Sequence, residues 1–135
     1  MERLSDYIQG ERVVRELRHH APEALEALAC DLEQPLNPPL ALAVARSLDD
    51  GRVPHFRASE VLMPAMMATF AVNPAAIEEQ ALAELKASCN CCEEIGRCWQ
   101  AMRDRADGEV CRSFCPNAEA FIGHGGQQGQ PMADG

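Results

Sequence analysis

The sequence predicts an all-α fold, a small helical bundle with a C-terminal four-cysteine metal-binding module. Three observations predict the helices. Apolar residues recur at the spacing of one helix face along much of the chain. No alternation of apolar and polar residues, which would indicate a strand, extends over more than four residues. Asparagine–proline pairs, which are typical helix starts, occur twice.

The N-terminal part contains three expected helices. Ser5 is the expected N-cap of the first, which continues to residue 17. Proline at a first-turn position begins the second, over residues 22–32, where leucines fall at helical spacing. The first asparagine–proline pair begins the third, over residues 38–50, which ends at Gly51.

Two further helices are expected before the cysteines. Residues 59–70 form a methionine-rich helix with Pro64 in or near its first turn. The second asparagine–proline pair, at residues 73–74, begins a helix that leads directly into Cys89. The methionines at helical spacing are interpreted as core residues, because the flexible thioether fills irregular gaps.

The C-terminal part is expected to bend between the cysteines. A loop or helix break is predicted at residues 93–96, with Gly96 supplying backbone freedom. Trp99 then begins a helix that stops near Gly108, and its ring is expected to shield the cysteines from water. A final turn or two starts at Pro116.

These elements predict three regions of the chain. Residues 1–58 form an N-terminal helical extension, residues 59–122 form a helical cysteine-cluster domain, and residues 123–135 form a disordered tail rich in glycine and glutamine. At 135 residues the chain is long enough for one compact core, so we do not expect the first two regions to be independent domains.

Composition excludes several classes of protein. A net charge of −9 without a basic block argues against nucleic acid as a partner. No secretory signal and no membrane-length apolar stretch is present, so we expect no membrane association and a cytoplasmic location. Phosphate loops, dinucleotide fingerprints, nucleophile elbows and zinc-protease motifs are absent. We therefore predict no catalytic residue, and nothing in the sequence requires an enzyme.

The cysteines carry the strongest functional signal. Four of the seven lie within the ten residues of "CNCCEEIGRC". In a reducing cytoplasm such a cluster is more often a metal site than a set of disulfides. The spacing is CxxC, five residues, a third cysteine, sixteen residues, and a cysteine followed by proline. The predicted ligands are Cys89, Cys92, Cys98 and Cys115.

Spacing also indicates the metal. A tight group of three cysteines with a remote Cys-Pro favours a [4Fe–4S] cluster, whereas zinc sites usually combine two CxxC pairs. Zn²⁺ remains the alternative, because tetrahedral zinc tolerates irregular spacings. The other readings are buried apolar thiols and a redox-active dithiol. Cys91 and Cys111 are extra thiols, either packing residues or participants in the site, and Cys30 is expected in the core.

The C-terminal half resembles a bacterial family of small proteins whose domain has no assigned function. The matching pieces are "VNPAAIEEQALAELKASC", "CNCCEEIGRC" and "FCPNAEAF", over residues 62–122. The family shares a Gly/Asn/Asp-Pro helix start, the CxxC and third cysteine, and an aromatic-Cys-Pro-Asn ending. The resemblance implies that the same four cysteines are the family's set, with Cys91 and Cys111 as extras.

Three functions follow as hypotheses. The first is electron transfer or redox sensing by an iron–sulfur protein that acts on a protein partner. The second is a structural zinc site that stabilises an interaction or adaptor protein. The third is a thiol redox switch in which Cys91 or Cys111 is the resolving thiol.

Overall fold

The computed structural model describes residues 2–129, and these confirm the predicted all-α class, with nine α-helices, one short 3-10 helix and no strand. The chain divides into two compact units. The first comprises Met1–Phe56 and Ile95–Asp104, and the second comprises Arg57–Glu94 and Arg105–Gly135. Within residues 2–129, none of the helices combines the length and apolar character needed to cross a membrane.

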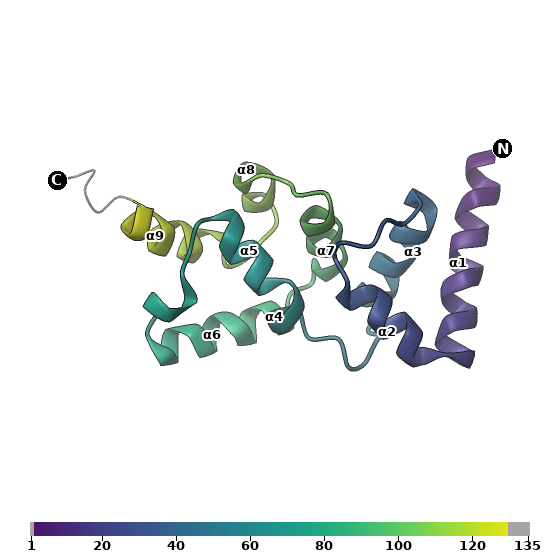
Figure 1. Ribbon diagram of the computed structural model, residues 1–135, viewed down its shortest axis with the longest axis horizontal. Coiled ribbons are helices and arrows are strands. Elements are labelled where there is room, and N and C mark those ends of the chain that lie inside the picture. The colour runs from purple at the N-terminus through teal and green to yellow at the C-terminus, as the bar shows by residue number, and fades with distance from the viewer. Residues whose placement is uncertain (1, 130–135) are drawn as a thin grey trace. The chain divides into compact units, whose positions relative to one another are not determined.

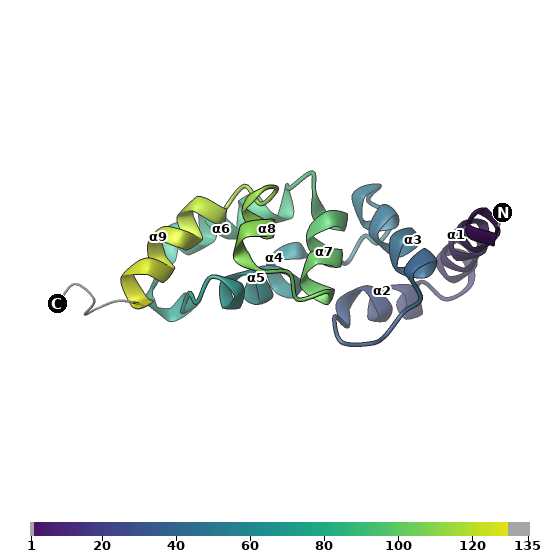
Figure 2. The ribbon, with the colours of Figure 1, turned by 90° about the horizontal axis from the view of Figure 1, so that it is seen from above.

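In the first unit, α3 lies between α1 and α7 (Figure 1, Figure 2). The helices of this unit are α1 (Glu2–His20), α2 (Pro22–Cys30), α3 (Pro38–Asp49) and α7 (Ile95–Arg103). Glycines allow both neighbours to approach the α3 backbone closely. A Cβ on Gly10 would lie 2.6 Å from the Pro39 carbonyl oxygen, and a Cβ on Gly96 would lie 2.4 Å from that of Ala45. Such packing leaves no room for a side chain.

Trp99 anchors the core of the first unit. Its side chain is fully buried, and its indole Nε1 donates a hydrogen bond to the Ala29 carbonyl at 2.7 Å. The Arg103 guanidinium lies 4.7 Å from the centre of the Trp99 ring. It also donates to the carbonyls of Asp31 and Gln34, at 3.1 and 2.6 Å. One aromatic and one arginine of α7 therefore fix the chain that leaves α2.

The second unit is built from shorter elements. They are α4 (Ala58–Val61), α5 (Met63–Thr69), the 3-10 helix η1 (Pro74–Ala76), α6 (Glu79–Asn90), α8 (Gly108–Arg112) and α9 (Ala118–Gly129). Met63, Met66 and Met67 are buried, as predicted for core residues. The rings of Phe70 and Phe121 lie 6.2 Å apart and join α5 to α9. The core of this unit thus uses methionine and phenylalanine.

Several predicted boundaries differ from the structure. The predicted helix over residues 59–70 is two helices separated at Leu62, because Pro64 has no N–H and its ring excludes the carbonyl four residues earlier. Asn73 caps only the 3-10 helix, through a 3.0 Å bond from Ala75 N–H to its side chain. Ile77 then leaves helical geometry to become buried, so α6 starts two residues later.

Other differences concern helix ends and Gly96. The first helix begins at Glu2 instead of the predicted cap Ser5. The break between α6 and α7 covers residues 91–94, and Gly96 lies inside α7 instead of in the break. Its N–H donates to the Asp49 carboxylate at 2.8 Å. Gly96 therefore permits close packing against α3 and does not serve as a hinge.

The end of the chain is partly helical. The sequence predicted a disordered tail from residue 123, whereas α9 continues to Gly129. Residues 130–135 lie outside the described part of the chain. Phe121 is fully buried and anchors the first turn of α9, from which the helix continues into the glycine-rich segment. Gly108, expected to end a helix, instead begins α8 behind its cap Asp107.

Candidate metal centre

The second unit contains three of the four predicted ligands, Cys89, Cys92 and Cys115. Cys89 is in the last turn of α6, and Cys92 follows just after the helix ends. The Cys92 N–H donates to the Cys89 carbonyl at 3.2 Å, so the CxxC segment is a closed turn. Cys115 lies in the turn between α8 and α9. All three side chains are partly buried.

The three sulfurs are close enough to interact electrostatically. The pKa of Cys89 is raised from 9.0 to about 11, mainly by burial; a hydrogen bond from Asn117 lowers it, and the nearby Cys115 and Cys92 contribute to the increase. Burial also raises the pKa of Cys115, and Cys92 adds to that increase. The thiolates therefore repel one another, and without a cation the thiols of Cys89 and Cys115 stay protonated near neutral pH.

Backbone amides favour the thiolate at the other end of the CxxC turn and at Cys115. Glu94 N–H donates to Cys92 Sγ at 3.2 Å, two residues beyond the cysteine. Hydrogen bonds from the backbones of Asn117 and Ala118 lower the pKa of Cys115. The proline after Cys115 has no N–H, so the first amide that can reach this sulfur is again two residues on. Both turns thus place amide donors where a thiolate would need them.

The sulfur of Cys89 accepts a hydrogen bond from a side chain. Asn117 is buried, with 6% of its surface exposed, and its amide Nδ2 donates to Cys89 Sγ at 3.3 Å and to the Leu85 carbonyl at 3.0 Å. The Cys89 bond lowers the pKa of that thiol. Asn117 therefore binds the Cys89 sulfur through its side chain, and its backbone amide lowers the pKa of Cys115. Sequence reasoning assigned no role to Asn117, although its place directly after Cys-Pro was visible in "FCPN".

The fourth predicted ligand, Cys98, belongs to α7 in the first unit, where its side chain is partly buried. The second unit by itself therefore supplies three of the four cysteines. Trp99, expected to shield the cysteines, has its hydrogen bond to Ala29 in the core of the first unit. Its large apolar ring is used there to join α7 to α2.

The remaining cysteines differ in environment. Cys111 is fully buried in the second unit, which agrees with a packing role, and burial raises the pKa of its thiol. Cys91 is exposed. Cys30 was predicted in the core but is exposed, because α2 ends at this residue and buries Leu25 and Ala29 instead.

The cysteine sulfurs are chemically suited to bind a thiophilic metal. Thiolates select zinc, copper(I) and iron–sulfur clusters, and a cation would offset both the burial and the repulsion that raise the thiol pKa values. Among the side chains that the structure describes, those of residues 8–124, no group of three or more His, Cys, Asp or Glu has the arrangement of a metal site, however. Binding therefore requires the sulfurs to turn toward a common point.

Comparisons with known proteins give no further information about this group of cysteines. No protein-family model, no curated protein and no solved structure matches the chain.

Proposed function

We propose that this protein binds a metal centre through Cys89, Cys92 and Cys115, together with Cys98 as the fourth ligand that the spacing predicts. The centre is a [4Fe–4S] cluster that transfers electrons to, or senses redox state for, a protein partner. The observation that carries the proposal is that N–H groups favour the thiolate at all three cysteines of the second unit: hydrogen bonds reach the sulfurs of Cys92 and Cys89, and backbone amides lower the pKa of Cys115.

Hydrogen bonds to cysteine sulfur are useful at a metal site but are not needed in a hydrophobic core. A buried thiol behaves as a small apolar group and needs no hydrogen bond. A metal-bound thiolate keeps much of its negative charge, and hydrogen bonds to the sulfur stabilise that charge and set the reduction potential of a cluster. Two sulfurs with hydrogen-bond donors, and a third cysteine whose pKa is lowered by neighbouring amides, support an electron-transfer centre more than a packing role.

A structural Zn²⁺ site is the second candidate. The observation that favours it is that the thiols come from two separate segments, the end of α6 and the turn before α9, which Asn117 joins by hydrogen bonds. An ion bound to both segments would stabilise this unit by on the order of 10 kcal/mol. In that case the metal would hold together an acidic helical adaptor without redox chemistry.

Metal analysis of anaerobically purified protein tests the proposal. We expect iron and acid-labile sulfide in equal amounts and a brown colour that reductant bleaches. Cys115→Ser should lose the iron, whereas Cys91→Ser, a neighbouring exposed cysteine, should keep it. Zinc without iron would support the structural site instead. Metal-free protein from cells supplied with iron and zinc, or equal iron content in both variants, would overturn the proposal.

A further inference from the structure

A polar cavity of about 290 Å³ lies between α1 and α3 of the first unit. Both helices present one face to it, since the contributing residues recur at intervals of three and four along each helix. Val14, Ala43 and Ser47 are buried small residues among those that line it. Their size explains why the two helices leave a hollow where larger side chains would fill the space.

Arginines surround this cavity. Arg15 and Arg18 come from α1, Arg46 from α3 and Arg52 from the segment after α3. Only two carboxylates, those of Glu11 and Asp50, belong to the same lining. The chain as a whole carries a charge of −9, so a local surplus of two positive charges is an exception to its composition. Guanidinium groups gathered around a concave surface concentrate anions there.

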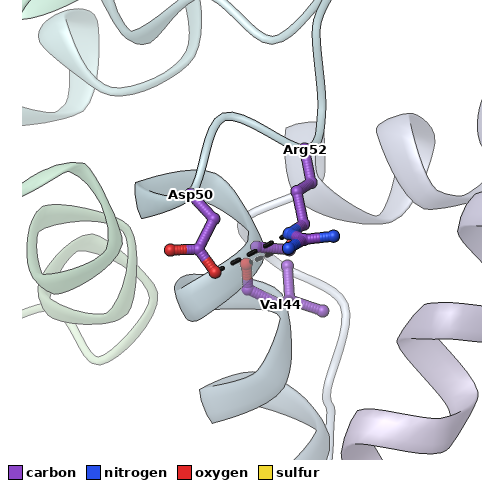
Figure 3. A network of polar contacts seen from close by, with 4 residues as sticks. Val44, Asp50 and Arg52 are labelled. Carbon is purple, nitrogen blue, oxygen red and sulfur yellow. Dashed lines mark hydrogen bonds and ion pairs between the residues drawn. The ribbon is translucent and has the colours of Figure 1, made fainter.

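The Arg52 side chain is held by a weak ion pair. Figure 3 shows it beside Asp50, with Val44 of α3 behind them, and the Nε to Oδ2 distance is 3.8 Å. Both side chains are about half exposed or more, at 51% and 61%. An exposed pair at this distance contributes little to stability. Arg52 can therefore exchange the Asp50 carboxylate for an anionic ligand at little cost.

A buried acceptor in the same wall lacks a donor. Glu11 Oε2 has no exposed surface and no hydrogen-bond partner in the structure. An oxygen without accessible surface cannot be reached by a ligand in the cavity, so Glu11 contributes its negative charge to the lining and no hydrogen bond. The Ser47 hydroxyl donates to the Val44 carbonyl at 2.7 Å and so does not supply that donor.

We propose that this cavity binds a small phosphate monoester. A phosphate monoester has a charge between about −1.5 and −2 at neutral pH, which matches the surplus of two arginines. The planar guanidinium pairs with phosphate oxygens through two parallel hydrogen bonds. Since one water occupies about 30 Å³, the volume corresponds to roughly ten water-sized groups, a molecule the size of a phosphorylated small polyol.

Calorimetric titration with glycerol 3-phosphate at low ionic strength tests the phosphate contact. We expect saturable binding that weakens with added salt. Arg15→Ala should weaken it about tenfold or more, because a charge-assisted hydrogen bond is lost. Arg12→Ala is the matched control: this exposed arginine is on the same helix but outside the lining, and its loss should change the affinity less than about twofold. Circular dichroism verifies that both variants fold.

A second titration tests the charge balance of the lining. Glu11→Gln removes one of its two carboxylates, so this variant should bind glycerol 3-phosphate several-fold more tightly than wild-type protein. Absence of saturable binding in the millimolar range overturns the proposal. So does equal weakening by Arg12→Ala and Arg15→Ala, or an affinity of Glu11→Gln that is no higher than that of wild-type protein.

Discussion

Replacing Asn117 by alanine tests whether its amide holds the cysteine group together. The change removes a 3.0 Å hydrogen bond to the Leu85 carbonyl and a 3.3 Å bond to Cys89 Sγ. A neutral hydrogen bond contributes about 1 kcal/mol, and a weaker bond to sulfur about 0.5–1 kcal/mol. Because Asn117 is 6% exposed, water cannot easily replace either donor. We expect a loss of about 2 kcal/mol in unfolding free energy.

Asn90→Ala is the matched control for this measurement. Asn90 also makes two side-chain hydrogen bonds to a distant segment, accepting from the Ser59 N–H and donating to the Ser59 hydroxyl, each at 3.0 Å. It is exposed, so water replaces the lost partners and we expect a cost of about 0.5–1 kcal/mol.

Urea unfolding of the metal-free protein, followed by circular dichroism, measures both variants. The expected loss for Asn117→Ala corresponds to a fall of about 6–10 °C in Tm for a chain of this size. The two asparagines differ mainly in burial, so the comparison isolates the contribution of the buried amide. If Asn117→Ala costs no more than Asn90→Ala, the buried amide does not organise the cysteine group.

Three further outcomes are expected. Gly96→Ala should lower the free energy of unfolding in urea by about 2–3 kcal/mol, because its Cβ would meet the α3 backbone. Gly123→Ala, whose Cβ would have nothing within 4 Å, should raise it by about 0.5–1 kcal/mol. The reverse order of the two variants would refute the packing of Gly96 against α3. Trp99→Phe should cost about 1–3 kcal/mol, measured in the same way, because the carbonyl of Ala29 loses its donor; an unchanged midpoint would contradict this role. Burial raises the folded-state pKa of Cys89 from 9.0 to about 11, so its stabilisation of metal-free protein is present below pH 9 and is lost as pH rises toward 11. Between pH 9 and 11 the Tm of Cys89→Ala should therefore fall less than the Tm of wild-type protein. Parallel dependence of the two Tm values on pH would contradict the raised pKa.

Local signals in the sequence predicted the helices well. Asn37 caps α3 as predicted, its side chain accepting from the Leu40 N–H at 2.9 Å, and the methionines of α5 are buried as predicted. Capping and helical periodicity depend on residues that are close in the sequence, so both can be predicted without knowledge of the tertiary structure. The all-α class follows from them.

Features that depend on distant residues could not be read in the same way. Sequence reasoning interpreted Gly96 as a flexible position. Its packing against Ala45 and Asp49 was not visible, because these residues are distant from it in the sequence. Ile77 leaves the predicted helix because its burial outweighs local helix propensity. Cysteine spacing indicated which thiols to compare, and the structure groups three of them in one unit. The buried amide of Asn117 became visible only when the end of α6 and the start of α9 were seen together.

X-ray absorption at the metal edge of anaerobically purified protein tests the proposed thiolate centre most directly. The account predicts a first coordination shell of sulfur, with metal–sulfur distances of about 2.3 Å. Iron–iron scattering in the same spectrum would identify a cluster, and its absence with zinc bound would identify the structural site. A first shell of nitrogen and oxygen alone, or protein that retains no metal, would contradict the proposed role of Cys89, Cys92 and Cys115.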